Sequence, residues 1–341
     1  MQQILENIAL KIIELHGFLN FGFLLICLII GILLLIKAGD SLSDASATLA
    51  KFLGVPPILI GLTVVSIATS APELFTTISA VTSNAKGLIL GNIIGSNIAN
   101  IGLILGVTLV IKPIHLTKTV PTFQKVTLLL VTLGFSGYLY FSPAHAITWQ
   151  CGSILLGFLT SYLIFLSYET IKERKLVQVP PLTNTDSNIG QNHQWISLGL
   201  IIGSSFGLWL GSETLVFGSK SLALQLGIPE ELIGFSIVAV GTSLPELAAS
   251  IALLKKSQTA MLLGNIIGSN LFNILLVGGV AGLLAPIRSN VANPWVDHIA
   301  MIILTAMLCF GLSGKAKGKA HGTALIVCYM IASITTWMIN A

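Results

Sequence analysis

The sequence predicts an all-α integral membrane protein in which about ten transmembrane helices form two inverted five-helix repeats. The chain of 341 residues is 54% hydrophobic and only 9% charged, and its mean hydropathy is +0.92. A soluble domain of this size would need far more polar residues to cover its surface. In addition, the apolar residues gather into segments of membrane-spanning length, and motifs of the first half recur in the second.

Ten candidate spans follow a short N-terminal segment. Residues 1–17 are amphipathic and lack the basic start and the cleavage site of a signal peptide, so we expect an interfacial helix that leads into the first span. Each later apolar segment is close to the roughly twenty residues that cross a bilayer. The approximate centres of the ten spans are Ile29, Val65, Leu103, Val131, Leu156, Phe206, Val238, Leu276, Ile303 and Cys328.

One long polar connection divides the spans into two groups of five. It covers residues 169–194 and contains several charged residues, two consecutive prolines and a polar run of loop composition. We therefore expect a first five-helix repeat at 18–168, a cytoplasmic linker loop at 169–194 and a second five-helix repeat at 195–341.

The two halves are copies of each other. Every marker of the first half recurs 173 residues later, with no insertion or deletion between Gly54 and Pro113 or between their counterparts. The matched pairs include Glu73 and Glu246, Gly91 and Gly264, Asn100 and Asn273, and Pro113 and Pro286. An internal duplication of this kind is typical of secondary transporters.

The distribution of Lys and Arg predicts the orientation. Five spans per repeat is an odd number, so the two repeats enter the membrane from opposite sides. If both termini lie outside, thirteen of the 17 Lys and Arg residues face the cytoplasm, and Lys11, Lys86, Lys220 and Arg288 do not. Because basic residues concentrate in cytoplasmic loops, we expect a multi-pass protein of the inner (plasma) membrane with both termini extracytoplasmic.

A carboxylate lies beside a proline within the second span. Pro72 has no N–H, so the carbonyl of Ala68, four residues earlier, loses its helical partner. Thr69 and Ser70 precede Glu73 by four and three residues and share its helix face. Carboxylate, hydroxyl and carbonyl oxygens are the ligands that Ca²⁺ and Na⁺ prefer. The second repeat offers the same set in Gly241, Thr242, Ser243, Pro245 and Glu246.

The third span supplies a polar stripe. Asn92, Ser96 and Asn100 recur every four residues on one helix face, and the Gly91–Gly95 spacing permits close helix approach. The eighth span repeats the pattern with Asn265, Ser269, Asn273, Gly264 and Gly268. A single polar stripe of this kind forms a helix-packing contact about as often as it forms an ion-binding site. Two buried carboxylates at equivalent repeat positions favour an ion site.

Motifs of other function classes are absent from the sequence. It has no Gly-rich phosphate loop, no Ser/His/Asp set and no HExxH motif, so we expect no enzyme, no catalytic residues and no prosthetic group. The net charge of +4 requires no nucleic-acid partner. We expect the lipid bilayer as the surroundings of the protein and no obligate protein partner.

We interpret Asp40 and Glu213 as interfacial residues that cap or tether helix ends. We expect His298 in or near a loop, as a solvated or interfacial histidine.

The repeated motifs resemble the two α-repeats of the sodium/calcium exchanger family, within the calcium/cation antiporter superfamily. The segments that carry the resemblance are 69–73 and 91–97 in the first half and 241–246 and 264–270 in the second. The resemblance covers essentially the whole chain through its ten-span, two-repeat plan. The short central loop leaves no room for a regulatory calcium-binding domain, so the chain is similar to the small prokaryotic exchangers.

The resemblance implies a cation cluster at the centre of the bilayer, formed by spans 2, 3, 7 and 8. Glu73 and Glu246 would bind Ca²⁺ in alternation with Na⁺, and spans 1 and 6 would slide to alternate the access. The further implied ligands are Thr69, Ser70, Thr242, Ser243, Ser96 and Ser269, with the backbone carbonyls of Ser66 and Ala239. The amides of Asn100 and Asn273 complete the candidate set.

The chain departs from the family pattern at two positions. Asn273 stands where the potassium-dependent branch has an aspartate, which argues against K⁺ coupling. Ala68 stands where the motif usually has glycine, and its methyl group is expected to tighten the bend beside the site.

The leading hypothesis is a secondary antiporter that exchanges Ca²⁺ for Na⁺ by alternating access. An H⁺/Ca²⁺ antiporter is the alternative, because buried glutamates can take up protons when they are desolvated. Against it, the glutamate–histidine pattern typical of the proton-coupled branch is missing. A passive cation channel is a third reading, which duplicated and inverted broken helices disfavour.

Overall fold

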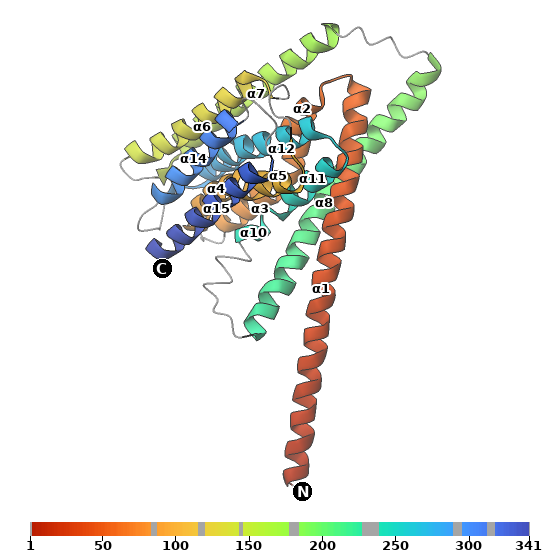
Figure 1. Ribbon diagram of the computed structural model, residues 1–341, viewed down its shortest axis with the longest axis vertical. Coiled ribbons are helices and arrows are strands. Elements are labelled where there is room, and N and C mark those ends of the chain that lie inside the picture. Colours follow the sequence, from red (N-terminus) through yellow and green to blue (C-terminus); the bar gives the residue numbers. More distant parts are fainter. Residues whose placement is uncertain are drawn as a thin grey trace.

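The computed structural model describes residues 2–82, 87–114, 120–142, 146–176, 184–226, 239–288, 295–311 and 318–340 (Figure 1). The first half contains α1 (Gln2–Leu53), α2 (Pro57–Ile60), η1 (Gly61–Val65), α3 (Ser66–Thr82), α4 (Gly87–Ala99), η2 (Asn100–Leu105), α5 (Gly106–Ile111), α6 (Thr122–Phe141), β1 (Ala146–Ile147) and α7 (Trp149–Leu176). The second half contains α8 (Asn184–Gln225), α10 (Ala239–Gly241), α11 (Leu244–Lys255), α12 (Thr259–Phe272), η4 (Asn273–Val277), α13 (Gly278–Leu284), β2 (Ile287–Arg288), α14 (Trp295–Gly311) and α15 (Lys319–Asn340). The segments η1, η2 and η4 are π-helical.

The predicted fold class is confirmed. Nine of the ten predicted span centres lie on helices, and the tenth, Val238, lies outside the described residues. Within the described ranges, six continuous helices are long and apolar enough to cross a membrane, and α14 is apolar but shorter, with 17 residues. Three of the six are composite, because a π-helical segment interrupts them without ending them.

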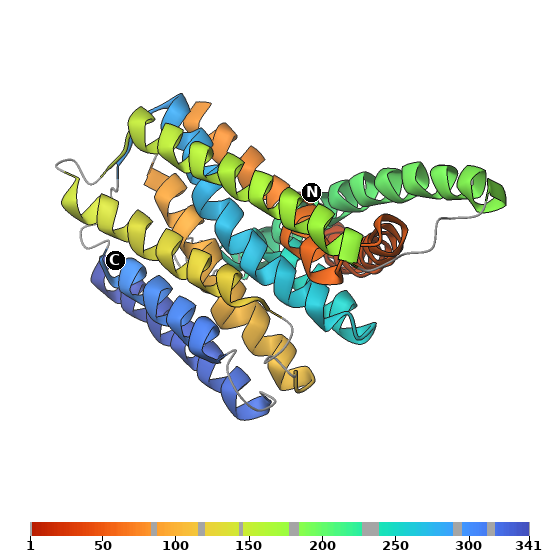
Figure 2. The same cartoon turned by 90° about the horizontal axis from the view of Figure 1, so that it is seen from above.

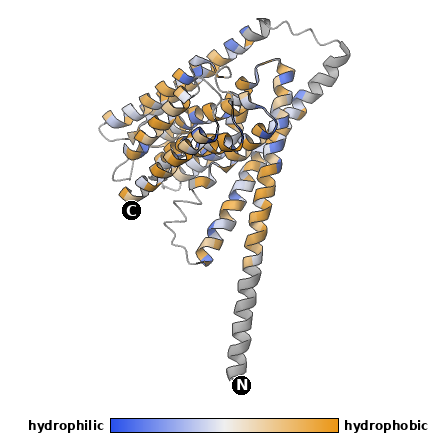
Figure 3. Ribbon diagram, viewed as in Figure 1, coloured by the Kyte–Doolittle hydropathy of each residue, from blue (hydrophilic) through white to orange (hydrophobic). Residues whose placement is uncertain are grey.

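Two long helices stand apart from the bundle. Helices α1 and α8 cross each other on one side of the shorter helices (Figures 1 and 2). They approach closely where both have glycine, since a Cβ atom on Gly31 would lie 2.9 Å from the carbonyl oxygen of Gly211. Much of α1 is hydrophobic (Figure 3), and side chains such as Phe23, Ile29 and Leu33 are more than half exposed, as expected for contact with lipid.

The helices next to the central linker are longer than the sequence suggests. α7 continues to Leu176 and α8 begins at Asn184, so both reach into the segment expected as a loop at 169–194. Lys172 and Glu169 lie 3.9 Å apart at a spacing of three residues, which supports the last turns of α7. At the other end of the chain, α1 runs unbroken from Gln2 through the expected interfacial segment and the first span.

Helix α12 forms the centre of the bundle, and all of its residues from Met261 to Phe272 are buried (Figure 2). α14 and α15 pack as a pair on one side of the bundle. β1 and β2 pair antiparallel, with Ile147 opposite Ile287, and this short ladder joins the connection between α6 and α7 to the segment that follows α13.

The glycines of the two polar stripes have different surroundings. A Cβ atom on Gly264 would collide with the carbonyl of Ile58, and one on Gly268 would collide with the Ser66 hydroxyl. Among the described residues, no atom would lie within 4 Å of a Cβ atom on Gly91 or Gly95. The close helix approach is present in the second repeat, where α12 packs against α2 and η1. For the first repeat it stays a prediction, because the repeat counterpart of α2 and η1 lies outside the described residues.

His298 differs from its expected place. It is 4% exposed on α14, and its Nδ1 lies 3.1 Å from the Ser136 hydroxyl of α6. The expectation of a solvated or interfacial histidine was wrong, because α14 begins at Trp295 and already packs against α6 at this residue.

We predict that Gly264→Ala destabilises the protein by about 1–3 kcal/mol, because the methyl group must push the Ile58 backbone away from α12. Thermal unfolding of the detergent-solubilised protein measures the effect. Gly91→Ala is the matched control, since no atom of the described residues would lie within 4 Å of a Cβ atom there and alanine is the better helix former. Equal destabilisation by the two substitutions would contradict the packing described.

Candidate functional site

The two proline–glutamate motifs meet in the interior. Glu73 on α3 and Glu246 on α11 are each 1% exposed. Their carboxyl groups are close enough for their negative charges to repel each other. The Ser70 hydroxyl of the first repeat donates a hydrogen bond to Glu246 Oε1 of the second, over 3.2 Å. Both carboxylates predicted from the sequence therefore belong to one site that the two repeats share.

The stripe of the eighth span contacts the same motif. Thr69 Oγ1 lies 3.3 Å from Asn265 Oδ1, to which it can donate, and 3.4 Å from the Ser269 hydroxyl. Asn265 Nδ2 in turn donates to the Ser250 hydroxyl over 3.4 Å. The sequence placed Asn265 on the stripe but not among the ion ligands, and the structure makes it the connection between α3, α11 and α12.

The polar stripes end where the helices change their winding. Asn100 is the first residue of η2, and Asn273 is the first residue of η4. Ser66 directly follows η1, and its hydroxyl donates to the carbonyl of Gly61, five residues earlier, over 2.6 Å. π-helical turns occur often at functional sites. Sequence reasoning missed all three, because a π-turn has no residue signature comparable to proline or glycine.

The site contains a concentration of unpartnered polar atoms. Among the described residues, thirteen buried side-chain N and O atoms have no hydrogen-bond partner, and nine of them belong to predicted site residues. These nine are both carboxylate oxygens of Glu73, Oε2 of Glu246, the hydroxyls of Ser96 and Ser243, and both side-chain amide atoms of Asn100 and Asn273. Since buried polar groups are normally hydrogen-bonded, this cluster requires an explanation.

The remaining predicted residues lie at the border of the cluster. The Ser66 hydroxyl is also 3.1 Å from the carbonyl of Asn265, and the Ser66 carbonyl lies 3.4 Å from Thr69 Oγ1. Thr242 is partly exposed in the turn between α10 and α11, and Ala239 is the first residue of α10.

The two prolines have different effects on the backbone. Pro72 lies inside α3, which continues through it, whereas Pro245 lies at the start of α11, separated from α10 by a turn at 242–243. The carbonyl of Gly241, which the sequence predicts to lack a helical partner, accepts a hydrogen bond from the Ser212 hydroxyl of α8 over 2.6 Å. The interruption expected at both prolines is therefore complete only in the second repeat.

Asp40 lies in a separate charge cluster at the end of α11. Lys256 Nζ is 2.8 Å from Asp44 Oδ1 and 3.9 Å from Asp40 Oδ1, and it donates to the Asp40 backbone carbonyl over 2.8 Å. These contacts attach α1 to α11. Glu213, the repeat counterpart of Asp40, is exposed.

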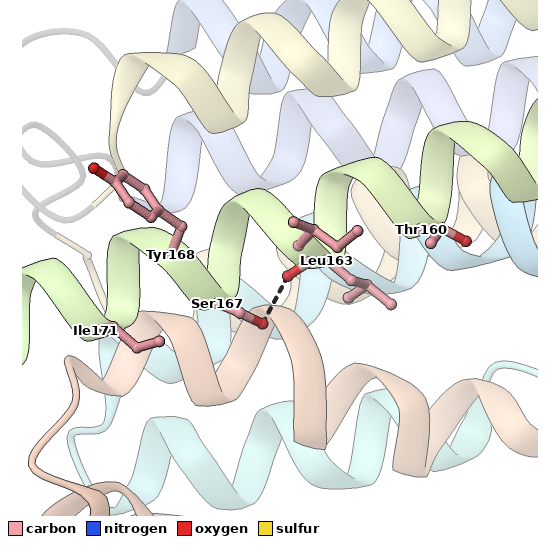
Figure 4. A pocket seen from close by; sticks show the side chains of 6 residues that line it. Thr160, Leu163, Ser167, Tyr168 and Ile171 are labelled. Carbon is pink, nitrogen blue, oxygen red and sulfur yellow. Dashed lines mark hydrogen bonds between the residues drawn. The ribbon is translucent and has the colours of Figure 1, made fainter.

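An open groove on the outer face of α7 is no competing ion site. Its lining residues all come from that one helix and include no carboxylate (Figure 4). The Ser167 hydroxyl is already bonded to the carbonyl of Leu163 over 2.8 Å. With Ile164 and Tyr168 well over half exposed, the groove has the character of a lipid-facing surface.

We predict that Asn265→Ala lowers the free energy of unfolding by about 1–3 kcal/mol, because the buried hydroxyls of Thr69 and Ser250 lose their shared partner. Chemical or thermal unfolding measures the loss. The matched control is Asn92→Ala in the first repeat, where a partly exposed amide donates to Thr77 over 3.4 Å. A loss at Asn92 as large as that at Asn265 would contradict the assigned role.

Comparison with known proteins agrees with this architecture. The model of the family described as sodium/calcium exchanger protein matches residues 23–168 and 196–338. The CaxA protein of Alkalimonas amylolytica is 34% identical over 317 residues, which cover 89% of this chain and 96% of CaxA. The sodium/calcium exchanger MaX1 of Methanosarcina acetivorans is 29% identical over 342 residues, which cover 89% of this chain and 95% of MaX1.

A solved structure shows the same fold. The sodium-calcium exchanger NCX_Mj superposes with a TM-score of 0.78 at 30% sequence identity, and the match covers 92% of this chain and 99% of that one. The family match spans both halves and leaves out only the chain ends and the central connection. The protein is therefore a multi-pass membrane antiporter that belongs to the sodium/calcium exchanger family.

Proposed function

We propose that the protein exchanges Ca²⁺ for Na⁺ across the membrane by alternating access, and that Glu73 and Glu246 hold the transported ions. The observation that carries this proposal is the cluster of nine unpartnered polar atoms around the two carboxylates. Charged groups buried without a counter-charge are strongly unfavourable, so the pair needs positive charge from elsewhere. Among the described residues, no Lys or Arg forms an ion pair with either glutamate.

The ligand chemistry supports Ca²⁺ and Na⁺ as the ions. Ca²⁺ takes six to eight oxygen ligands, and one Ca²⁺ would neutralise both carboxylates. In the described part of the chain, no three His, Cys, Asp or Glu side chains lie close enough together to hold a metal ion. We therefore propose neutral oxygens as the other ligands. We propose the hydroxyls of Thr69, Ser70, Ser96, Thr242, Ser243 and Ser269, the amides of Asn100 and Asn273, and the carbonyls of Ser66 and Ala239.

The hydrogen bonds of the site suggest how a cation would enter the network. Ser70 donates a hydrogen bond to Glu246 Oε1. A hydroxyl can rotate to present a lone pair, so the same side chain can serve a cation as a ligand. Ser243, its repeat counterpart, has no hydrogen-bond partner and is already free to do so. Binding of a cation at these two positions would then require only side-chain rotations.

Several features support the proposed topology. The family match ends near the expected boundaries of the repeats at 18–168 and 195–341. A relative, the inner membrane protein YrbG of Escherichia coli, is 31% identical over 311 residues, which cover 87% of this chain and 92% of YrbG. We propose both termini outside the cytoplasm, on the basis of the Lys and Arg distribution.

We further propose that α1 and α8 slide as a pair, because they contact each other more extensively than they contact the bundle.

In proteoliposomes loaded with Na⁺, we predict Ca²⁺ uptake when the outside is free of Na⁺. Glu73→Gln should reduce this uptake to the level of empty liposomes, because the amide removes the negative charge that holds the cation. The exposed carboxylate of Glu213 provides the control, and Glu213→Gln should retain uptake.

A proton uncoupler and an imposed pH gradient separate the two antiport hypotheses. Uptake that persists with the uncoupler and requires internal Na⁺ supports Na⁺ coupling. Uptake that follows the pH gradient and ignores Na⁺ would instead establish H⁺/Ca²⁺ exchange. Flux that needs neither counter-ion would indicate a channel and refute both.

A further inference from the structure

A chain of buried side-chain contacts connects three helices beside the two glutamates. The hydroxyl of Ser269 on α12 lies 3.4 Å from the hydroxyl of Thr69 on α3. Thr69 Oγ1 lies 3.3 Å from Asn265 Oδ1, and Asn265 Nδ2 donates to the Ser250 hydroxyl of α11 over 3.4 Å. All four side chains are 0% exposed, so bulk water cannot replace any of these partners.

The orientation of the Asn265 amide recurs in the first repeat. Asn92 is the repeat counterpart of Asn265, and Thr77 is the counterpart of Ser250. Asn92 Nδ2 donates to the Thr77 hydroxyl over 3.4 Å, as Asn265 Nδ2 does to Ser250. In both repeats the amide nitrogen is therefore the atom that faces the neighbouring hydroxyl. In the second repeat this leaves the amide oxygen, which can only accept, to face Thr69.

The Thr69 hydroxyl has one proton and several neighbours that can accept it. Its Oγ1 is 3.3 Å from Asn265 Oδ1 and 3.4 Å from the Ser66 carbonyl, and the hydroxyl also interacts with the Glu246 carboxyl. If Thr69 donates to Glu246, its hydrogen points to the carboxylate to which a cation would bind. For Thr69 to serve as a ligand of that cation, its proton needs a different acceptor.

The amide oxygen of Asn265 suits this role because it has no proton of its own. Ser269 is also a proposed ligand, so its proton too must point away from the cation. When Ser269 donates to Thr69 and Thr69 donates to Asn265, each of the two hydroxyls keeps a lone pair for a cation. The chain needs an acceptor at its end, and Asn265 Oδ1 lies slightly closer to Thr69 than the Ser66 carbonyl does.

We propose that Asn265 is a positioning residue of the ion site, whose amide oxygen accepts the Thr69 proton and so directs a lone pair of Thr69 to the cation. This inference rests on the proposed function, because Thr69 and Ser269 are ligands proposed there. Ser250 holds the amide in the required orientation. Without Asn265, a buried proton loses its acceptor whenever Thr69 binds the cation, and this cost weakens cation binding.

The test is equilibrium binding of ⁴⁵Ca²⁺ to the purified full-length protein without Na⁺. We expect Asn265→Ala to raise the Kd for Ca²⁺ about tenfold, equivalent to about 1.4 kcal/mol. Asn265→Leu has no acceptor but fills the space of the amide, and it should show the same increase. It covers the case that the alanine variant does not fold. Thr69→Ser retains the hydroxyl and should keep the Kd close to that of the wild type.

A double-mutant cycle separates positioning from a merely structural role. Thr69→Val keeps the shape of the side chain without the hydroxyl, and it should raise the Kd by itself. In the Thr69→Val background, Asn265→Ala should raise the Kd no further, because no proton remains to be accepted. Thr108→Val is the control. It removes another fully buried hydroxyl, which donates to the Leu105 carbonyl over 2.8 Å, and it should leave the Kd unchanged.

An unchanged Kd in Asn265→Ala and Asn265→Leu would overturn the inference, because another group would then accept the Thr69 proton equally well. An increase of the same size with and without the Thr69 hydroxyl would also overturn it and leave Asn265 a structural residue. A wild-type protein that binds no Ca²⁺ would refute the proposed function and this inference together. The expected pattern of Kd values without Na⁺-dependent uptake would refute the proposed function alone.

Discussion

The structure depends on the burial of two carboxylates at one place in the membrane interior. Glu73 and Glu246 are almost completely inaccessible, and no basic side chain pairs with either in the described part of the chain. Such an arrangement is unfavourable unless a cation neutralises it. The neighbouring serines and asparagines, most of them unpartnered, offer oxygen atoms without adding charge. The surrounding helices therefore hold the two carboxylates close together, and a bound cation supplies the charge that stabilises them.

The duplicated sequence does not give a symmetric site. Gly264 and Gly268 let α12 contact the first repeat directly, whereas no atom of the described residues would lie within 4 Å of a Cβ atom on Gly91 or Gly95. Pro245 follows a complete interruption of the helix, while Pro72 lies within a continuous one. An exchanger with two inverted repeats needs two different conformations of the same motif, one for each direction of access. Differences between the repeats are what the alternating access proposed above predicts for a molecule in one of these conformations.

Much of this site could be predicted from the sequence, because a carboxylate inside a membrane span is energetically unfavourable and this one recurs at the matched position of both repeats. The fold class followed from hydropathy and the constant repeat spacing, and the shared position of Glu73 and Glu246 followed from their matched motifs. The bond from Ser212 to Gly241 could not be predicted, since it joins different spans. Neither could the π-helical turns at Asn100 and Asn273, which depend on packing rather than on residue type. The burial of His298 was missed for the same reason.

The most direct test of the account is the anomalous diffraction of a crystal soaked with Sr²⁺ as a stand-in for Ca²⁺. The account predicts a strong anomalous peak between the carboxylates of Glu73 and Glu246, with oxygen atoms of both repeats at about 2.3–2.6 Å or slightly beyond. A strong peak elsewhere, for example at Asp40 and Asp44, with none between the two glutamates would contradict it.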